Sequence, residues 1–130
     1  MSAEGRRWLV YAQENLRAAA MCLEGNLFNP CLQNAQQAVK KALKALHLAG
    51  GLPLKKTHSI GELRGDLLRA KVDPVLSEEA AELLDTIYLP SKYPLGSVLP
   101  NFEPDAEMAR RCLTIANQVV SIATRRFASE

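Results

Sequence analysis

The chain has 130 residues, the length of one domain, and can bury a core without disulfides or metals. Hydrophobic residues make up 48% and charged residues 23%, which is typical of globular proteins, and the net charge of +2 is too small to indicate nucleic-acid binding by itself. There is no basic-then-apolar leader and no apolar run of about 20 residues. We therefore expect a single cytoplasmic domain over residues 1–130, neither secreted nor embedded in a membrane.

The charge is distributed unevenly along the chain. Residues 1–65 carry a net charge of +5, whereas residues 66–130 carry −3. This asymmetry can produce a basic face, or it can favour pairing between chains, head to tail or about a two-fold axis. The alternative is two solvated surfaces that meet no partner.

The cysteines and histidines form no recognisable site. The three cysteines, Cys22, Cys31 and Cys112, include no C-x-x-C pair, and an odd number of cysteines cannot all form disulfides within the chain. We therefore expect them to be reduced and mostly buried. His47 and His58 have no partner at a spacing typical of metal ligands. We therefore predict no metal site and no cofactor.

Five helices are predicted between breaks at glycine and proline, and no segment has a convincing strand pattern. The first spans about residues 3–24, with Trp8 near its start and an apolar stripe on one side. The second begins at Pro30, because a proline at the first helical position loses no needed donor, and Asn29 is the expected N-cap. It ends before Gly50.

The other three helices have recognisable start signals. Ser59-Ile60-Gly61-Glu62 matches a capping box and opens a short third helix. Ser77 and two acidic residues open the fourth, which is expected to stop where a long loop runs from Pro90 to Pro104. The fifth runs from Pro104 to about Phe127, with a seam at alternating four- and three-residue steps: Met108, Cys112, Ile115, Val119 and Ile122. The predicted fold is all-α, an up-and-down bundle of four to five helices.

The second predicted helix has two different faces. One face carries residues suited to close packing: Ala35, Ala38, Val39, Ala42, Leu43, Ala45 and Leu46. Elsewhere Gln37, Lys41 and Lys44 lie about one turn apart, so their side chains can converge. They can form an ordinary solvated face, or they can bind an anion or the acidic patch of a partner.

Four features occur in order along nearly the whole chain. They are Trp8, the helix Ala35-Gln36-Gln37-Ala38-x-x-Lys41-Ala42-x-Lys44-Ala45, the run Lys56-Thr57-His58, and Tyr88-x-x-Ser91-Lys92-Tyr93-Pro94. Together they resemble the HEPN domain (higher eukaryotes and prokaryotes nucleotide-binding). The resemblance implies a helical bundle that dimerises and that often partners a small nucleotidyltransferase in a toxin–antitoxin-like pair. It also implies that many members use an Arg followed by a His as a metal-independent endoribonuclease site across the dimer.

The ribonuclease motif of that family is degenerate in this chain. The Arg-Tyr-Pro of relatives is Lys92-Tyr93-Pro94 here, and the window that follows, through Leu99, contains no histidine. Lysine lacks the planar fork with which arginine grips a phosphate, and without an imidazole no side chain there titrates near neutral pH. We therefore expect a binding protein associated with nucleotide or RNA, without ribonuclease chemistry.

The candidate anion or nucleotide site is the set Gln37, Lys41, Lys44, Lys56, His58, Lys92 and Tyr93. His58 is a weak catalytic candidate, since a lone histidine is not a catalytic constellation, and it can instead fix the loop before the third helix. The expected partners are a second copy of the chain, a small nucleotidyltransferase, and a nucleotide or RNA. The alternative functions are a divergent metal-independent endoribonuclease toxin and a ligand-free structural interaction module.

Overall fold

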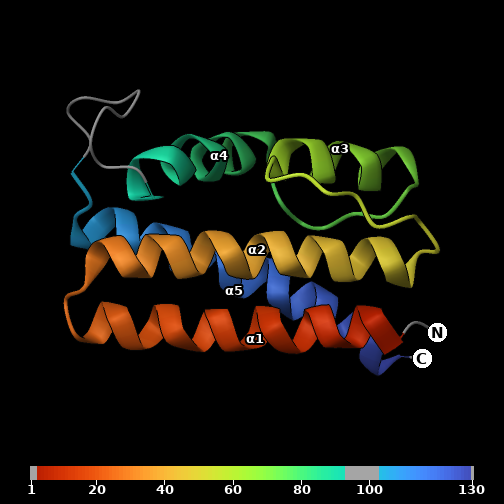
Figure 1. The fold of residues 1–130 in the computed structure, drawn as a ribbon, viewed down its shortest axis with the longest axis horizontal. Coiled ribbons are helices and arrows are strands. Elements are labelled where there is room, and N and C mark those ends of the chain that lie inside the picture. The colour runs from red at the N-terminus through yellow and green to blue at the C-terminus, as the bar shows by residue number, and fades with distance from the viewer. Residues whose placement is uncertain (1–2, 93–102, 130) are drawn as a thin grey trace.

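Five helices make up the described part of the chain. The computed structural model describes residues 3–92 and 103–129, without the side chains of residues 88–92. The helices are α1 (Ala3–Glu24), α2 (Phe28–Ala49), α3 (Ile60–Arg69), α4 (Glu78–Lys92) and α5 (Ala106–Ala128), and these residues include no strand (Figure 1). The predicted all-α helical bundle is confirmed.

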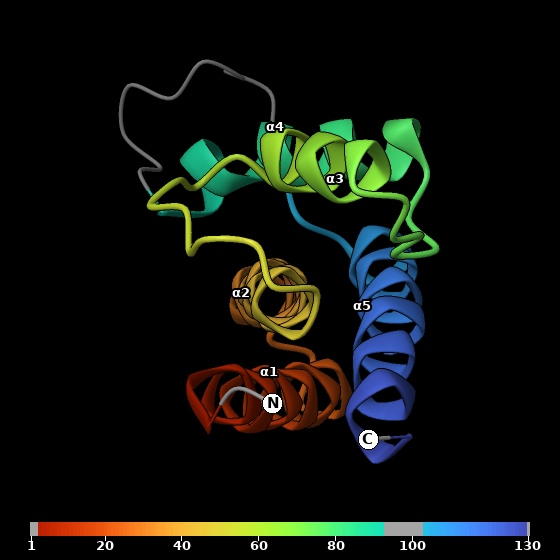
Figure 2. The same cartoon turned by 90° about the vertical axis from the view of Figure 1, so that its right-hand side faces the viewer.

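Helix α2 is the centre of the bundle and contacts each of the other four helices. Helix α1 runs antiparallel to it on one side, while α3 and α4 follow each other along the opposite side (Figure 1). Viewed along its axis, α2 has α5 on a third side (Figure 2). On its fourth side only the segment between α2 and α3 passes near it, and no described helix covers it.

The small residues of α2 explain its central position. Ala35, Ala38, Ala42 and Ala45 are fully buried, so the neighbouring backbones can approach closely. Val39, Leu43 and Leu46 beside them are also buried and supply the apolar bulk that drives packing. The packing face predicted for this helix is therefore confirmed.

Three predicted helix boundaries are wrong. Helix α5 begins at Ala106 with Asp105 as its N-cap, two residues after the predicted start at Pro104. Helix α2 begins at Phe28 with Leu27 as its N-cap, so Asn29 is not the cap and Pro30 is the third helical residue. A proline is tolerated there because the first four N–H groups of a helix have no partner within the helix. Helix α4 continues past Pro90 to Lys92, since a proline this close to a helix end interrupts only its final turn.

The buried stripe of α5 differs in part from the predicted seam. Cys112 and Val119 are buried as expected, but Met108, Ile115 and Ile122 are only half-buried. The core side of α5 is completed by the small residues Ala109, Ala116, Val120 and Ala123 and by the aromatic ring of Phe127 near the end of the helix. The alanines face inward because α5 packs closely against α1 and α2.

The capping box at the start of α3 is only half formed. Ser59 Oγ accepts a hydrogen bond from the Glu62 N–H at 3.1 Å, as predicted. The reciprocal bond is absent, because the Ser59 N–H donates to Thr57 Oγ1 at 3.1 Å and the Glu62 carboxylate binds Lys55 and Thr57 instead. The glutamate thus fixes the segment that precedes α3 rather than closing its own helix turn.

Candidate anion-binding face

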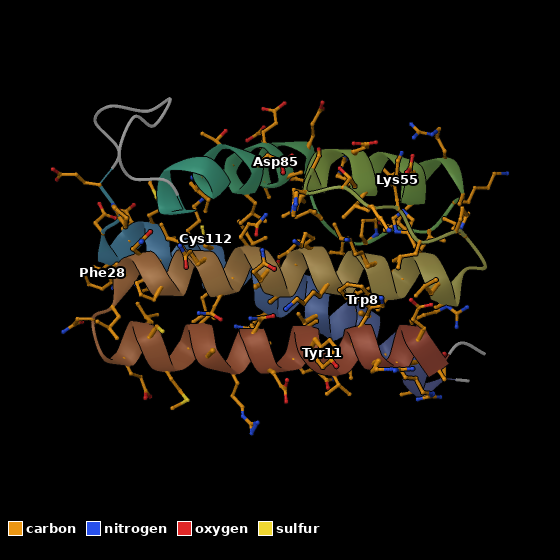
Figure 3. All side chains as sticks on the ribbon, in the orientation of Figure 1. Trp8, Tyr11, Phe28, Lys55, Asp85 and Cys112 are labelled. Carbon is orange, nitrogen blue, oxygen red and sulfur yellow. The ribbon has the colours of Figure 1, made fainter. Side chains whose placement is uncertain are left out.

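A group of lysines and aromatic rings lies on the side of α2 that no described helix covers. We call it the lysine face and define it by Trp8, Tyr11 and Asn15 of α1 and Lys40, Lys41 and Lys44 of α2. Figure 3 shows Trp8 between α1 and α2, with Tyr11 nearby on α1. The spacing of the three lysines on one helix brings them to the same side.

Lys44 is closely surrounded by other side chains. Its side chain is 9% exposed, and its ammonium nitrogen lies 5.2 Å from the centroid of the Trp8 ring, a cation–π contact. Burial lowers the pKa of Lys44, because the charged form loses hydration. No carboxylate among the described residues forms an ion pair with it.

Lys41 is positioned by α1. Its ammonium donates to Asn15 Oδ1 at 2.8 Å and lies 5.9 Å from the centroid of the Tyr11 ring. Asn15 is oriented in turn by Asn34, whose Oδ1 accepts from Asn15 Nδ2 at 2.9 Å. Burial lowers the pKa of Lys41, and Glu14 offsets part of this effect.

Lys40 connects α2 to the segment that precedes α3. Its side chain is 8% exposed, and its Nζ lies 3.2 Å from Nδ1 of His58. His58 itself is exposed. Of the two possibilities for Gln37, Lys41 and Lys44, an ordinary solvated face does not fit Lys44, which is buried. Lys40 is buried as well, because α1 and the segment before α3 pack over the stems of these lysines.

The structure brings together only part of the predicted site. Lys41 and Lys44 lie on the lysine face, and His58 is attached to it through Lys40. Gln37 is half-buried and donates to its neighbour Gln36 at 2.8 Å, while Lys56 is exposed. The side chain of Lys92 and all of Tyr93 lie outside the described residues, as do the side chain of Tyr88 and the loop after Tyr93.

Sequence reasoning missed three contributors to this face. Tyr11 and Asn15 follow Trp8 at three- and four-residue steps on α1, a spacing that places all three on one side of the helix. That spacing was a usable signal. Lys40 was missed because nothing in the local sequence says that His58 folds back onto it.

The arrangement suits a group that carries negative charge and hydrogen-bond acceptors. An ammonium group that is partly buried loses part of the free energy of its hydration. An anion bound beside it compensates for part of that loss. The rings of Trp8 and Tyr11 add flat surfaces on which a base can stack. Among the described residues, no group of three or more His, Cys, Asp or Glu is arranged to hold a metal ion.

The family model for the HEPN domain matches residues 6–126. The chain belongs to the HEPN domain family. Among curated proteins, no sequence matches this HEPN domain significantly.

Two solved structures are similar over nearly their whole length. TT1696 from Thermus thermophilus is 28% identical with a TM-score of 0.75, and the match covers 96% of this chain and 99% of that one. ST0689, described as an archaeal HEPN homologue, is 25% identical with a TM-score of 0.69, and the match covers 92% of this chain and 94% of that one. In the described part of this HEPN domain, no helix has the length and apolar character needed to cross a bilayer.

Proposed function

We propose that this HEPN domain binds a phosphate-bearing ligand, a nucleotide or RNA, on its lysine face and does not cleave it. The observation that carries the proposal is Lys44, a lysine only 9% exposed that contacts a tryptophan ring and forms no ion pair with a described carboxylate. A phosphate beside Lys44 and Lys41 would supply the missing negative charge. Tyr11, 46% exposed, offers a ring to an unpaired base.

Two observations support binding without cleavage. The family's Arg…His pair is replaced by Lys92 with no histidine after it, so the loop offers no imidazole as a general base. The other candidate, His58, has a lysine ammonium 3.2 Å from its Nδ1. An ammonium can only donate, so it occupies the lone pair of that nitrogen and favours a positioning role for His58.

The binding experiment uses the single tryptophan of the chain, which lies on the lysine face. Titration with ATP or a short single-stranded RNA should change Trp8 fluorescence, and the affinity should fall as salt rises. Lys44→Gln and Lys41→Gln should each weaken binding by about tenfold, the effect of losing one charge-assisted hydrogen bond.

The matched control is Arg110→Gln, which removes one positive charge from an exposed position on α5. It should leave the affinity nearly unchanged. Equal weakening by Arg110→Gln would show only a general charge effect, and an absence of binding at low salt would favour the ligand-free structural module.

The ribonuclease alternative has a direct test. Purified protein is incubated with single-stranded RNA in the presence of a chelator, and His58→Ala is assayed beside it. We expect no cleavage by either protein. Cleavage that His58→Ala abolishes would establish the endoribonuclease toxin instead.

We also propose, on the family resemblance, that the chain forms a homodimer and partners a small nucleotidyltransferase in a toxin–antitoxin-like pair. The opposite charges of its two halves support pairing between chains. Light scattering during gel filtration, alone and after mixing with the product of a neighbouring gene, tests both assemblies. A monomer that associates with neither would contradict this part of the proposal.

A further inference from the structure

A pocket lies apart from the lysine face, between the C-terminal part of α2, the segment after it, and α3. Its volume is about 540 Å³. Its apolar walls are formed by Leu52, Pro53, Leu54 and Ala70. Four polar side chains complete the lining: His47, Lys55, Asp66 and Arg69. Small-molecule sites commonly have volumes of about 300–1,000 Å³ and combine apolar walls with a few placed polar groups.

His47 lines this pocket and has a buried nitrogen without a hydrogen-bond partner. The side chain is 2% exposed, and its Nδ1 lies 2.8 Å from the carbonyl oxygen of Leu43. A carbonyl can only accept, so Nδ1 carries a proton, and Nε2 is an acceptor when the ring is neutral. Nε2 is buried and has no hydrogen-bond partner, which is rare for a buried polar atom.

A carboxylate lies close to this nitrogen and is also an acceptor. Asp66 Oδ2 lies 4.0 Å from His47 Nε2, beyond hydrogen-bond distance. The same oxygen accepts from Lys55 at 2.9 Å, while Oδ1 accepts from Arg69. These bonds, that of Lys55 above all, lower the pKa of Asp66 and keep it ionised at neutral pH. His47 Nε2 thus lacks a donor, and the carboxylate oxygen beside it cannot supply one.

We propose that this pocket binds a small, largely apolar molecule whose hydroxyl, amide or ring amino group donates a hydrogen bond to His47 Nε2. Its apolar body would lie against Leu52, Pro53 and Leu54. A donor placed beside Nε2 and Oδ2 can reach either atom, because the two acceptors are only 4.0 Å apart.

The pocket does not suit an anion. Asp66 and the Nε2 lone pair both repel negative charge, and the charges of Lys55 and Arg69 are already matched by Asp66 and Glu62. This distinguishes the pocket from the lysine face, where Lys44 forms no ion pair with a described carboxylate. Binding of a small molecule in this pocket is therefore independent of nucleotide binding on the lysine face.

The experiment compares two probes of similar shape, phenol and anisole, of which only phenol carries a donor. The whole protein is titrated while NMR follows the imidazole nitrogens of His47 and the methyl groups of Leu52 and Leu54. Phenol should shift these signals and bind about tenfold more tightly than anisole, the usual effect of one satisfied buried acceptor.

Two variants locate the effect. His47→Phe keeps a ring but removes Nε2, so phenol and anisole should bind it equally. Ala70→Phe introduces a ring at an exposed position on the pocket wall, should fill the space, and should abolish binding of both probes even if His47→Phe fails to fold. Equal affinity of the wild-type protein for the two probes, or a water on Nε2 that phenol does not displace, would overturn the proposal.

Discussion

Asp85 of α4 caps the N-terminus of α3 from a distance of 25 residues along the chain: its Oδ1 accepts from the Ile60 N–H at 2.7 Å. Its other oxygen accepts from the Gly61 N–H at 2.9 Å and from the Ser59 hydroxyl at 3.3 Å. Figure 3 shows Asp85 where α4 meets the start of α3. A carboxylate on unpaired N–H groups at a helix start is favoured by both hydrogen bonding and the helix dipole. It also anchors the segment that carries His58.

Replacing Asp85 should therefore destabilise the bundle. Asp85→Ala leaves two backbone donors without their partner, and we expect the free energy of unfolding to fall by about 1–3 kcal/mol. Urea denaturation at a fixed protein concentration measures the change. Glu82→Ala, an exposed acid on the same helix, is the control and should have little effect; an equal loss in both variants would argue against the cap.

The second prediction concerns the pKa of Asp66. Lys55 donates to Asp66 at 2.9 Å and pairs with Glu62 at 2.8 Å, and these bonds lower the pKa of both carboxyl groups. In Lys55→Gln the pKa of Asp66 should rise toward its ordinary value, as followed by NMR titration of its side-chain carbon. Arg69→Gln should raise it less, because the Arg69 contribution is the smaller one.

The sign of the accompanying stability change follows from linkage. A carboxyl group whose pKa is lower in the folded state stabilises the fold above its unfolded pKa, and this contribution is lost as pH falls through the folded value. Wild-type protein should thus lose more stability on acidification than Lys55→Gln does. Parallel acid profiles for the two proteins would contradict the ion-pair network.

The third prediction tests the close approach of α1 to the end of α5. A Cβ atom on Gly5 would lie 2.9 Å from Cζ of Phe127, whose ring is 2% exposed. Although alanine is favoured in helices by about 1 kcal/mol over glycine, overpacking commonly costs about 1–3 kcal/mol. We expect Gly5→Ala to lower the free energy of unfolding by about 1 kcal/mol.

A double variant separates the clash from other effects. Phe127→Leu removes the end of the ring, so Gly5→Ala should destabilise that background much less, or stabilise it. Thermal unfolding of the four proteins gives the coupling between the two positions. Additive effects of the two substitutions would show that the Phe127 ring does not clash with the side chain at position 5.

The fourth prediction concerns thiol reactivity. Burial raises the pKa of Cys112 to about 11, and burial also raises the pKa of Cys31, so little reactive thiolate forms at neutral pH. Cys22 is only half-buried. Iodoacetamide should modify Cys22 first in native protein and reach the other two only after unfolding, as read by peptide mass spectrometry. Rapid native labelling of Cys112 would contradict its burial.

Local signals were sufficient for most helix boundaries. Ser59, Ser77 and Asp105 cap α3, α4 and α5 with hydrogen bonds to N–H groups three residues ahead. Such caps, and the apolar spacing between them, act over one or two helix turns, so they can be read directly from neighbouring residues. The boundary at Phe28 was missed because Leu27 makes no side-chain cap.

Family membership was likewise predictable from ordered motifs along the chain, and the HEPN model confirms it over residues 6–126. The candidate site was predictable only in part. Lys41 and Lys44 share one helix face, which their spacing shows. Their contacts with the rings of Trp8 and Tyr11 depend on how α1 packs against α2.

The remaining features depend on segments that meet only in the folded chain. Whether Lys40 is solvated or buried depends on the segment around His58 that folds over it, and whether His47 faces a pocket depends on Asp66 of another helix. The predicted hydrogen bond from the Ser59 N–H to the Glu62 carboxylate does not form, because Lys55 and Thr57 bind that carboxylate instead. Local sequence sets which backbone groups need partners, but long-range packing selects the partner, because several groups of similar chemistry compete for the same place.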